Sequence, residues 1–268
     1  MRVDRVDRAR GGALRPGADA RAGGCPAGRV RQDDDVSAGP GDAGRVRVVP
    51  AHVWYARSAP VVAADLLGAW ITTRSPEGEV TIRITEVEAY GGADDPGSHA
   101  FHGRSARNDA MFAEPGRLYV YRHLGLHHCV NIVTSPIGHP SAVLLRAGEV
   151  VDGVELAWAR RARFGVVDTD RHLARGPARL AVALGLDLSA NRADVTEAGG
   201  VVVVHRRENA TRPALASGPR VGVGGEGADG ARFPWRLWLV GEPTVSPFRR
   251  AYRSSSSRSG PTSGTTGQ

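Results

Sequence analysis

Two carboxylates and a phenol stand at alternate positions near the end of residues 80–90, as Glu86, Glu88 and Tyr90. The segment alternates at period two and is rich in β-branched residues, which predicts a β-strand. On a regular strand these side chains share one face with the apolar residues that precede them, the last of which is Ile84. A buried carboxylate without a partner is costly, so the pattern predicts a partner, a metal or a reaction. The alternative is a strand that leaves the core after Ile84, with solvated acids.

Further side chains capable of chemistry follow in the next stretch of sequence. A loop rich in Gly, Asp and Pro ends in an imidazole at His99. Residues 118–121 have the alternation of a second strand, with Tyr119 and Tyr121 on one side. Asn131 adds a side-chain amide. Carboxylates, aromatic rings, an imidazole and an amide in one stretch indicate a site for a flat, hydrogen-bonding ligand.

The histidines also suggest a metal site of the kind used by a zinc-dependent hydrolase. The candidate ligands are His99, His123, His127, His128 and Cys129. Their spacing matches no standard zinc-ligand pattern. Adjacent residues on a strand point to opposite faces, which separates neighbouring members of the set. We therefore predict no metal and no other cofactor.

All 35 basic residues are arginine, and the chain has no lysine. Arginine suits forked contacts to phosphate and stacking on bases. It forms no Schiff base, so covalent catalysis through an amine is excluded except at the terminal amine. The net charge of +7 comes from the ends: residues 1–47 carry ten arginines and seven acids, residues 249–268 carry four arginines and no acid, and the residues between carry 21 of each. Bulk charge therefore does not establish nucleic-acid binding.

The two cysteines, Cys25 and Cys129, lie far apart in the sequence and predict no disulfide framework. This pattern suits a reducing cytoplasm. No apolar run is long enough to span a membrane, and no hydrophobic core of a signal peptide is present. We therefore expect a soluble, cytoplasmic protein with no membrane partner.

Composition divides the chain into three parts. Residues 1–50, rich in Arg, Gly and Asp and without an aromatic residue, predict a disordered leader. Residues 51–249 predict one α+β domain with a mainly antiparallel, curved β core flanked by helices. Residues 250–268 predict a disordered Ser/Thr/Gly tail. Within the domain the patterns predict helices over 60–68, 152–163 and 176–184, and strands over 70–73, 80–90, 118–121, 141–147 and 201–204.

The order of the motifs carries a resemblance to a known family. The chain contains Glu86-x-Glu88-Ala-Tyr90, Asp95-Pro-x-Ser-His99, Arg107-Asn108-x-x-Met-Phe112, Pro-Gly-x-Leu-Tyr-Val-Tyr121 and Cys129-x-Asn131. Later come Val143-Leu-Leu-Arg146-Ala, Gly176-Pro-Ala-Arg-Leu180, Arg220-Val-Gly-Val223 and Pro234-Trp-Arg236. This series, over residues 53 to 248, resembles the 3-methyladenine (alkyladenine) DNA glycosylase family of base-excision repair. Any single motif is weak, but so many in this order are not a chance match.

The resemblance implies a monofunctional glycosylase that flips an alkylated or deaminated purine out of double-stranded DNA and hydrolyses its N-glycosidic bond. It implies that Glu88 deprotonates the attacking water and stabilises an oxocarbenium-like transition state. Arg146 matches a residue near that water and the backbone phosphate. Tyr90, His99 and Tyr121 match the rings that sandwich the extruded base.

Two further positions follow from the same resemblance. Asn131 matches the amide that inspects the base edge and disfavours guanine through its exocyclic amino group. Leu124 stands where many family members have a tyrosine that wedges into the emptied stack. Leucine is an apolar wedge in other minor-groove binders, although it has no stacking face. Leu124 is therefore our hypothesis for the intercalating residue.

Purely structural roles remain open for several of these residues. Tyr121 can be ordinary strand packing, Asn131 a turn cap, Arg146 a salt-bridge partner and Glu86 a supporting residue. The alternative function is a non-catalytic damaged-DNA binder of the same fold, which has no need for Glu88 in the slot. The expected partner is double-stranded DNA with damaged purines, bound by a monomer, nucleoid-associated if the protein is bacterial.

Overall fold

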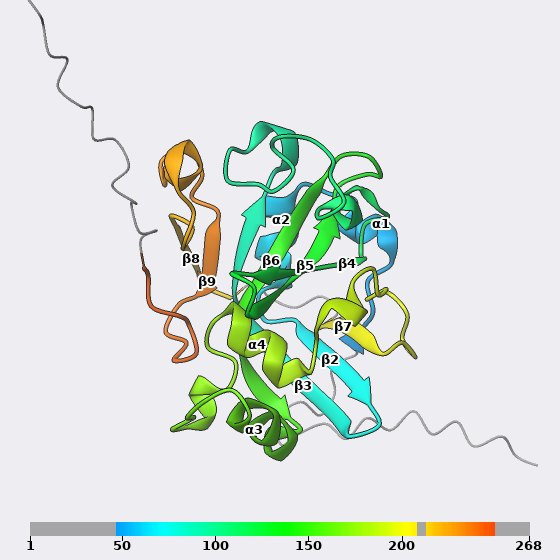
Figure 1. The fold of residues 1–268 in the computed structure, drawn as a ribbon, viewed down its shortest axis with the longest axis vertical. Helices are drawn as coiled ribbons and strands as arrows, with labels where there is room; N and C mark the ends of the chain where they lie inside the picture. The colour runs from blue at the N-terminus through cyan, green and yellow to red at the C-terminus, as the bar shows by residue number, and fades with distance from the viewer. Residues whose placement is uncertain (1–46, 208–212, 250–268) are drawn as a thin grey trace, which may run out of the picture. The chain divides into compact units, whose positions relative to one another are not determined.

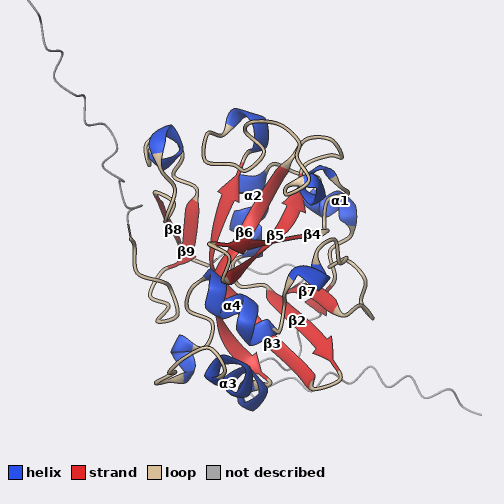
Figure 2. Ribbon diagram, viewed as in Figure 1, coloured by secondary structure: helices blue, strands red, loops and turns tan. Residues whose placement is uncertain are grey.

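The computed structural model describes residues 47–207 and 213–249 (Figure 1). In this part of the chain nine strands pair, all antiparallel, along the path β1-β7-β2-β3-β6-β5-β4, and β9 joins β3 and β8. Helices and short helical turns surround this curved sheet (Figure 2), which confirms the predicted α+β class. The predicted leader before residue 47 and the tail after residue 249 lie outside the described residues.

The elements have the following bounds. The strands are β1 Arg47–Val48, β2 Trp70–Ser75, β3 Gly78–Tyr90, β4 Leu118–His123, β5 His127–Thr134, β6 Ser141–Asp152, β7 Val202–Arg207, β8 Leu215–Gly218 and β9 Arg236–Leu239. The α-helices are α1 His52–Tyr55, α2 Ala59–Leu66, α3 Val154–Ala162 and α4 Pro177–Leu184. The 3-10 helices are η1 Gly92–Asp94, η2 Asp109–Phe112, η3 Asp170–His172, η4 Leu188–Ala190 and η5 Gly225–Ala228. Strand β1 pairs with β7, so regular structure begins before residue 51, where the sequence placed the start of the domain.

Strand β3 is the element around which the sheet is built. It pairs with β6 along most of its length and with β2 through its first half. The turn between β2 and β3 closes at the pair Ser75–Gly78, around Pro76 and Glu77. Beyond the end of β2, strand β9 takes over the same edge and pairs with the segment that contains Glu88. The second half of β3 is therefore held on both sides.

Helix α4 begins and ends where the local signals predict. Pro177 opens α4, where a missing N–H is tolerated, and Gly185 ends it with φ of 70°, a conformation that glycine adopts without steric cost. Apolar residues of α2 and α4, including Leu66 and Leu180, join residues of β3 and β6 in one buried core. Burial of these side chains holds the helices against the sheet.

A β-bulge in β3 overturns one expectation from the sequence. Regular alternation predicted that Glu86 and Glu88 share the apolar face of Ile84. In the structure the pairing of β3 with β6 shifts on both sides of Glu86, and the core side chains after the shift are Val87 and Ala89. One extra residue in a strand reverses which side chains face the core. The prediction of a shared face was therefore wrong, and the carboxylates lie on the face opposite the core.

Candidate active site

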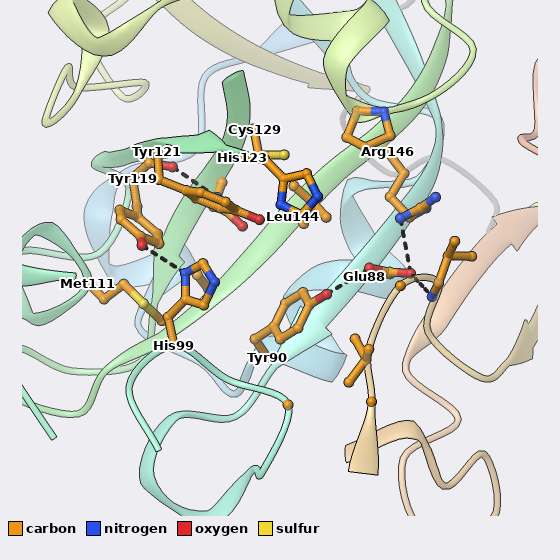
Figure 3. A pocket seen from close by; sticks show the side chains of 18 of the residues that line it. Glu88, Tyr90, His99, Met111, Tyr119, Tyr121, His123, Cys129, Leu144 and Arg146 are labelled. Atoms are coloured by element: carbon orange, nitrogen blue, oxygen red, sulfur yellow. Dashed lines mark hydrogen bonds and ion pairs between the residues drawn. The ribbon is translucent and has the colours of Figure 1, made fainter. Parts of the chain in front are cut away.

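The Glu88 carboxylate lies at the centre of the candidate site and is fully buried. Tyr90 donates its hydroxyl to Oε2 at 2.8 Å, and the Val221 backbone N–H donates to Oε1 at 2.6 Å. Arg146 Nη1 lies 3.2 Å from the same Oε1 (Figure 3). Donors on both oxygens fix the plane of the carboxylate, because each hydrogen bond to a charged group is strong and directional.

The Tyr90 hydroxyl keeps its proton at neutral pH and acts as a hydrogen-bond donor. Burial, followed by the neighbouring negative charge of Glu88, raises the pKa of Tyr90 well above its ordinary value. Burial likewise raises the pKa of Tyr121, with a smaller contribution from the thiol of Cys129. Both phenols therefore stay protonated, and Tyr90 holds the carboxylate rather than competing with it for a proton.

Glu86 holds the arginine that reaches Glu88. Its carboxylate accepts from Arg146 Nε at 2.9 Å and Arg236 Nε at 2.7 Å, and from the backbone N–H and hydroxyl of Ser246 at 2.6 and 2.9 Å. Burial alone would raise the pKa of Glu86, but the two arginines and the Ser246 N–H outweigh it and leave the pKa below its ordinary value. Glu86 is thus a fully paired supporting residue.

Three rings form the opposite wall of the site. The Tyr121 ring lies 4.6 Å from the His99 ring, edge to face, and 5.4 Å from Tyr119, stacked, so the two tyrosines share one side of β4 as predicted. His99 Nδ1 is 2.9 Å from the Tyr119 hydroxyl. Burial, then the positive charges of Arg107 and His123, lower the pKa of His99. The imidazole is therefore neutral at neutral pH.

These side chains line one cavity of about 400 Å³, within the size range of sites for small organic ligands. Figure 3 shows Tyr90 and Glu88 on one side and the rings of His99, Tyr119 and Tyr121 on the other. The site residues from the sequence that line it are Glu88, Tyr90, His99, Tyr121, Asn131 and Arg146. Sequence reasoning missed other lining residues, among them Pro96, Gly97, Met111, Pro177 and residues 221–224. The Arg220–Val223 motif signalled the last group, but nothing in the sequence gave it a role.

Asn131 is fixed by the pairing of β4 with β5. It stands opposite Tyr119 in register and donates its side-chain amide to the Tyr119 carbonyl oxygen at 2.9 Å. The side chain is buried and lines the cavity. Its amide is therefore a rigid polar group on the cavity wall.

Leu124 lies outside the cavity, at the tip of the β4–β5 hairpin. It is 80% exposed and has φ of 50°, and Gly125 follows with φ of 71°. Leu126 N–H donates to the His123 carbonyl oxygen and closes the turn. Two successive positive φ values define a type I′ turn, in which asparagine followed by glycine is the favoured pair. A leucine in this conformation is strained and exposed.

The histidines and cysteine do not assemble into a metal site. Over residues 47–207 and 213–249, no group of three His, Cys, Asp or Glu side chains is placed to hold an ion. Burial raises the pKa of the Cys129 thiol, so the thiol stays neutral. In the same ranges no helix is long and apolar enough to cross a bilayer.

Comparison with known proteins decides the family. A model of the methylpurine-DNA glycosylase family matches residues 53–243. The chain belongs to the methylpurine-DNA glycosylase family. A protein of Leifsonia xyli is 50% identical over 203 residues, 75% of this chain and 93% of its own length. Proteins of Streptomyces avermitilis and Mycobacterium bovis are each 46% identical, over 73% and 72% of this chain and 90% and 92% of their own lengths. All three carry the name "Putative 3-methyladenine DNA glycosylase".

Membership of the methylpurine-DNA glycosylase family fixes the class of reaction. The protein is a DNA glycosylase, a hydrolase that acts on N-glycosidic bonds, and its process is DNA repair. DNA is its substrate polymer. The cavity described above is the candidate place for that hydrolysis.

Proposed function

We propose that the protein excises alkylated or deaminated purines, such as 3-methyladenine, from double-stranded DNA with a water activated by Glu88. The observation that carries the proposal is the buried Glu88 carboxylate, which faces an aromatic cavity and is held by Tyr90, Arg146 and Val221. A carboxylate in this position takes a proton from a water that attacks the anomeric carbon. Its negative charge also stabilises the oxocarbenium-like transition state.

The cavity walls suit an extruded base. Tyr90 on one side and the His99 and Tyr121 rings on the other form a slot for a planar heterocycle, and stacking on such rings is worth about 1–3 kcal/mol per base. Asn131 adds a fixed amide that inspects the base edge and rejects the exocyclic amino group of guanine. A neutral His99 does not repel a purine that carries a positive charge from alkylation.

Leu124 acts in the proposal as the wedge that fills the vacated stack. Its support is the combination of strain and exposure at the hairpin tip. Strained residues persist where function maintains them, and apolar side chains inserted between base steps stabilise a distorted duplex.

The proposed reaction ends at base release. Strand cleavage by a bifunctional glycosylase proceeds through an amine, and this chain has no lysine, so no group other than the terminal amine could form the Schiff base. One chain supplies every side chain of the slot, so the proposal needs only a monomer.

The test is release of free base by the full chain from two duplexes, one methylated and one with a single hypoxanthine, with an undamaged duplex as control. We expect free purine from both damaged duplexes and an intact strand with an abasic site. Tight binding of the damaged duplex without release would instead show a damage-binding protein. Strand scission in step with base release, trapped by borohydride, would contradict the monofunctional mechanism.

A further inference from the structure

The loop after β3 and the segment after β8 are joined by a buried ion pair. Arg220 Nη1 lies 2.5 Å from Asp95 Oδ2, and Nη2 lies 2.6 Å from Oδ1. Both side chains have zero exposure. Asp95 also accepts from the backbone N–H groups of Gly91 and Gly97, at 3.0 and 2.9 Å. The pair therefore connects two loops that bring residues to the cavity.

Stability alone does not account for this pair. Removing two charges from water is costly, and apolar replacements for buried ion pairs are often neutral or stabilising. Arg220 also donates to the carbonyl oxygens of Ala89 and Gly227, at 3.0 and 2.9 Å, while its buried Nε has no hydrogen-bond partner in the described residues. Four hydrogen bonds from Nη1 and Nη2 therefore fix the guanidinium, although its Nε donor is left unsatisfied.

The Arg220 guanidinium also packs over the ring of Tyr90. Its guanidinium carbon is 4.7 Å from the centroid of the Tyr90 ring, with Phe233 and Trp235 at 5.4 and 5.5 Å. Such contacts between a cation and ring faces are attractive and directional, more so when they are desolvated. The next residue along the chain, Val221, donates its N–H to Glu88. A single guanidinium thereby fixes the places of both Tyr90 and Val221.

The surrounding glycines show how closely the backbone packs around this guanidinium. A Cβ on Gly97 would approach Arg220 Nη2, and a Cβ on Gly227 would approach the backbone nitrogen of Gly97. Both approaches would be closer than real Cβ atoms make. At Gly97 the added carbon would meet the guanidinium itself, and at Gly227 it would meet the backbone of Gly97, so glycine permits both close approaches. The site is built around the ion pair with little freedom to shift.

We propose that the Asp95–Arg220 pair is a positioning device for the carboxylate of Glu88. In the described residues three groups contact that carboxylate, and the pair holds two of them, the Tyr90 hydroxyl and the Val221 N–H. Neither Asp95 nor Arg220 touches the reacting atoms; each acts through its neighbours. The inference rests on the proposed role of Glu88 as the group that activates water.

The test is single-turnover excision of hypoxanthine by the full chain with Asp95→Asn, at saturating enzyme and well below the unfolding temperature. Asparagine keeps the shape and removes the charge. Small misplacements of catalytic groups cost up to about 100-fold in rate, so we expect the maximal rate to fall about 10- to 100-fold. We expect the enzyme concentration at half-maximal rate to change less than about twofold, because the DNA-contacting surface is intact.

Asp194→Asn is the matched control. The Asp194 side chain is 6% exposed and contacts Arg117 and His52, each at 3.2 Å, and Thr196, away from the cavity lining. We expect the Asp194→Asn substitution to lower the unfolding temperature and to leave the excision rate unchanged. Arg220→Lys, which keeps the charge but not the planar fork, is a second variant and should slow excision as Asp95→Asn does.

Slow excision in Asp95→Asn and Arg220→Lys with normal excision in Asp194→Asn supports the inference. An excision rate in Asp95→Asn or Arg220→Lys within about twofold of wild type, or an equal loss in Asp194→Asn, overturns it. Glu88→Gln is run in the same assay. If Glu88→Gln retains the wild-type excision rate, the proposed function itself fails. If Glu88→Gln loses excision while Asp95→Asn stays active, only the positioning role is rejected.

Discussion

Glu86 shows how single residues of this site divide their tasks. It lies two positions before Glu88 on the same strand, yet it accepts four hydrogen bonds and does not line the cavity. Arg146 connects the two carboxylates, since its Nε binds Glu86 and its Nη1 contacts Glu88. Two chemically identical side chains therefore serve as a support and as a candidate base because their partners differ.

The first prediction concerns the pH dependence of stability. The pKa of Glu86 is lowered in the folded protein, so its stabilising effect is present above its ordinary pKa of 4.5 and is lost as the pH falls through the lower, folded value. Glu86→Gln should lower the free energy of unfolding by about 3 kcal/mol at pH 7, because it breaks a buried charge network. Urea unfolding should show the gap to wild type narrowing below pH 4.5.

Glu149→Gln is the control for that prediction. Glu149 pairs with Arg83 across the same two strands, but its side chain is 47% exposed. We expect a change of less than about 1 kcal/mol. A Glu86→Gln deficit that stays constant between neutral and acid pH would contradict the assigned network.

The second prediction isolates the Tyr90 hydroxyl. Tyr90→Phe keeps the ring and removes the donor to Glu88 Oε2. A hydrogen bond to a charged group is worth about 1.5–3 kcal/mol, so single-turnover excision should slow by about 10- to 100-fold. Tyr121→Phe removes a hydroxyl from the same cavity without touching Glu88 and should change the rate less than about threefold. Equal effects of the two substitutions would exclude a special role for the Tyr90 hydroxyl.

At the scale of elements, the sequence predicted strands at β3, β4 and β6 and the helix α4, but neither strand β5, which carries Asn131, nor the bend in β3. The alternation of β-branched residues located β3, and Pro177 with Gly185 bounded α4. The shift of register at Glu86 was not predictable, because a bulge depends on the partner strand and not on local pattern alone. The sequence also could not predict the hydrogen bond from the Val221 N–H to Glu88, because the two residues are 133 positions apart.

The β4–β5 hairpin carries the third prediction. Leu124→Asn places a residue favoured in type I′ turns where a strained leucine stands, so stability should be unchanged or rise by up to about 1 kcal/mol. Capture of an extruded fluorescent purine in a duplex should nevertheless weaken, because the apolar wedge is removed. Val166→Asn, at an 87% exposed position in the loop after α3, should leave capture unchanged. Unaltered capture in Leu124→Asn would reject the wedge.

At the scale of the whole molecule, charge and chemistry are separated along the chain. The two ends supply the net charge of +7, while the residues between them are neutral overall and contain every residue that lines the cavity. Attraction to DNA backbone and cleavage of the glycosidic bond are therefore expected to respond differently to removal of the ends.

The fourth prediction compares the full chain with residues 47–249. Affinity for an undamaged duplex should depend less steeply on salt in the shorter chain, because the slope of log K against log salt falls by about 0.9 for each phosphate that a terminal arginine neutralises. Excision at saturating enzyme should be unchanged. Identical salt slopes for the two proteins would show that the terminal arginines do not bind the DNA backbone.

The central claim is that the Glu88 carboxylate supplies the chemical step. Its most direct test is single-turnover excision of hypoxanthine from a duplex by Glu88→Gln, with the affinity for the same duplex measured in parallel. We predict an affinity within about threefold of wild type and an excision rate lower by at least about 100-fold, as expected for loss of general base catalysis. An unchanged excision rate in a variant that folds and binds normally would contradict the account.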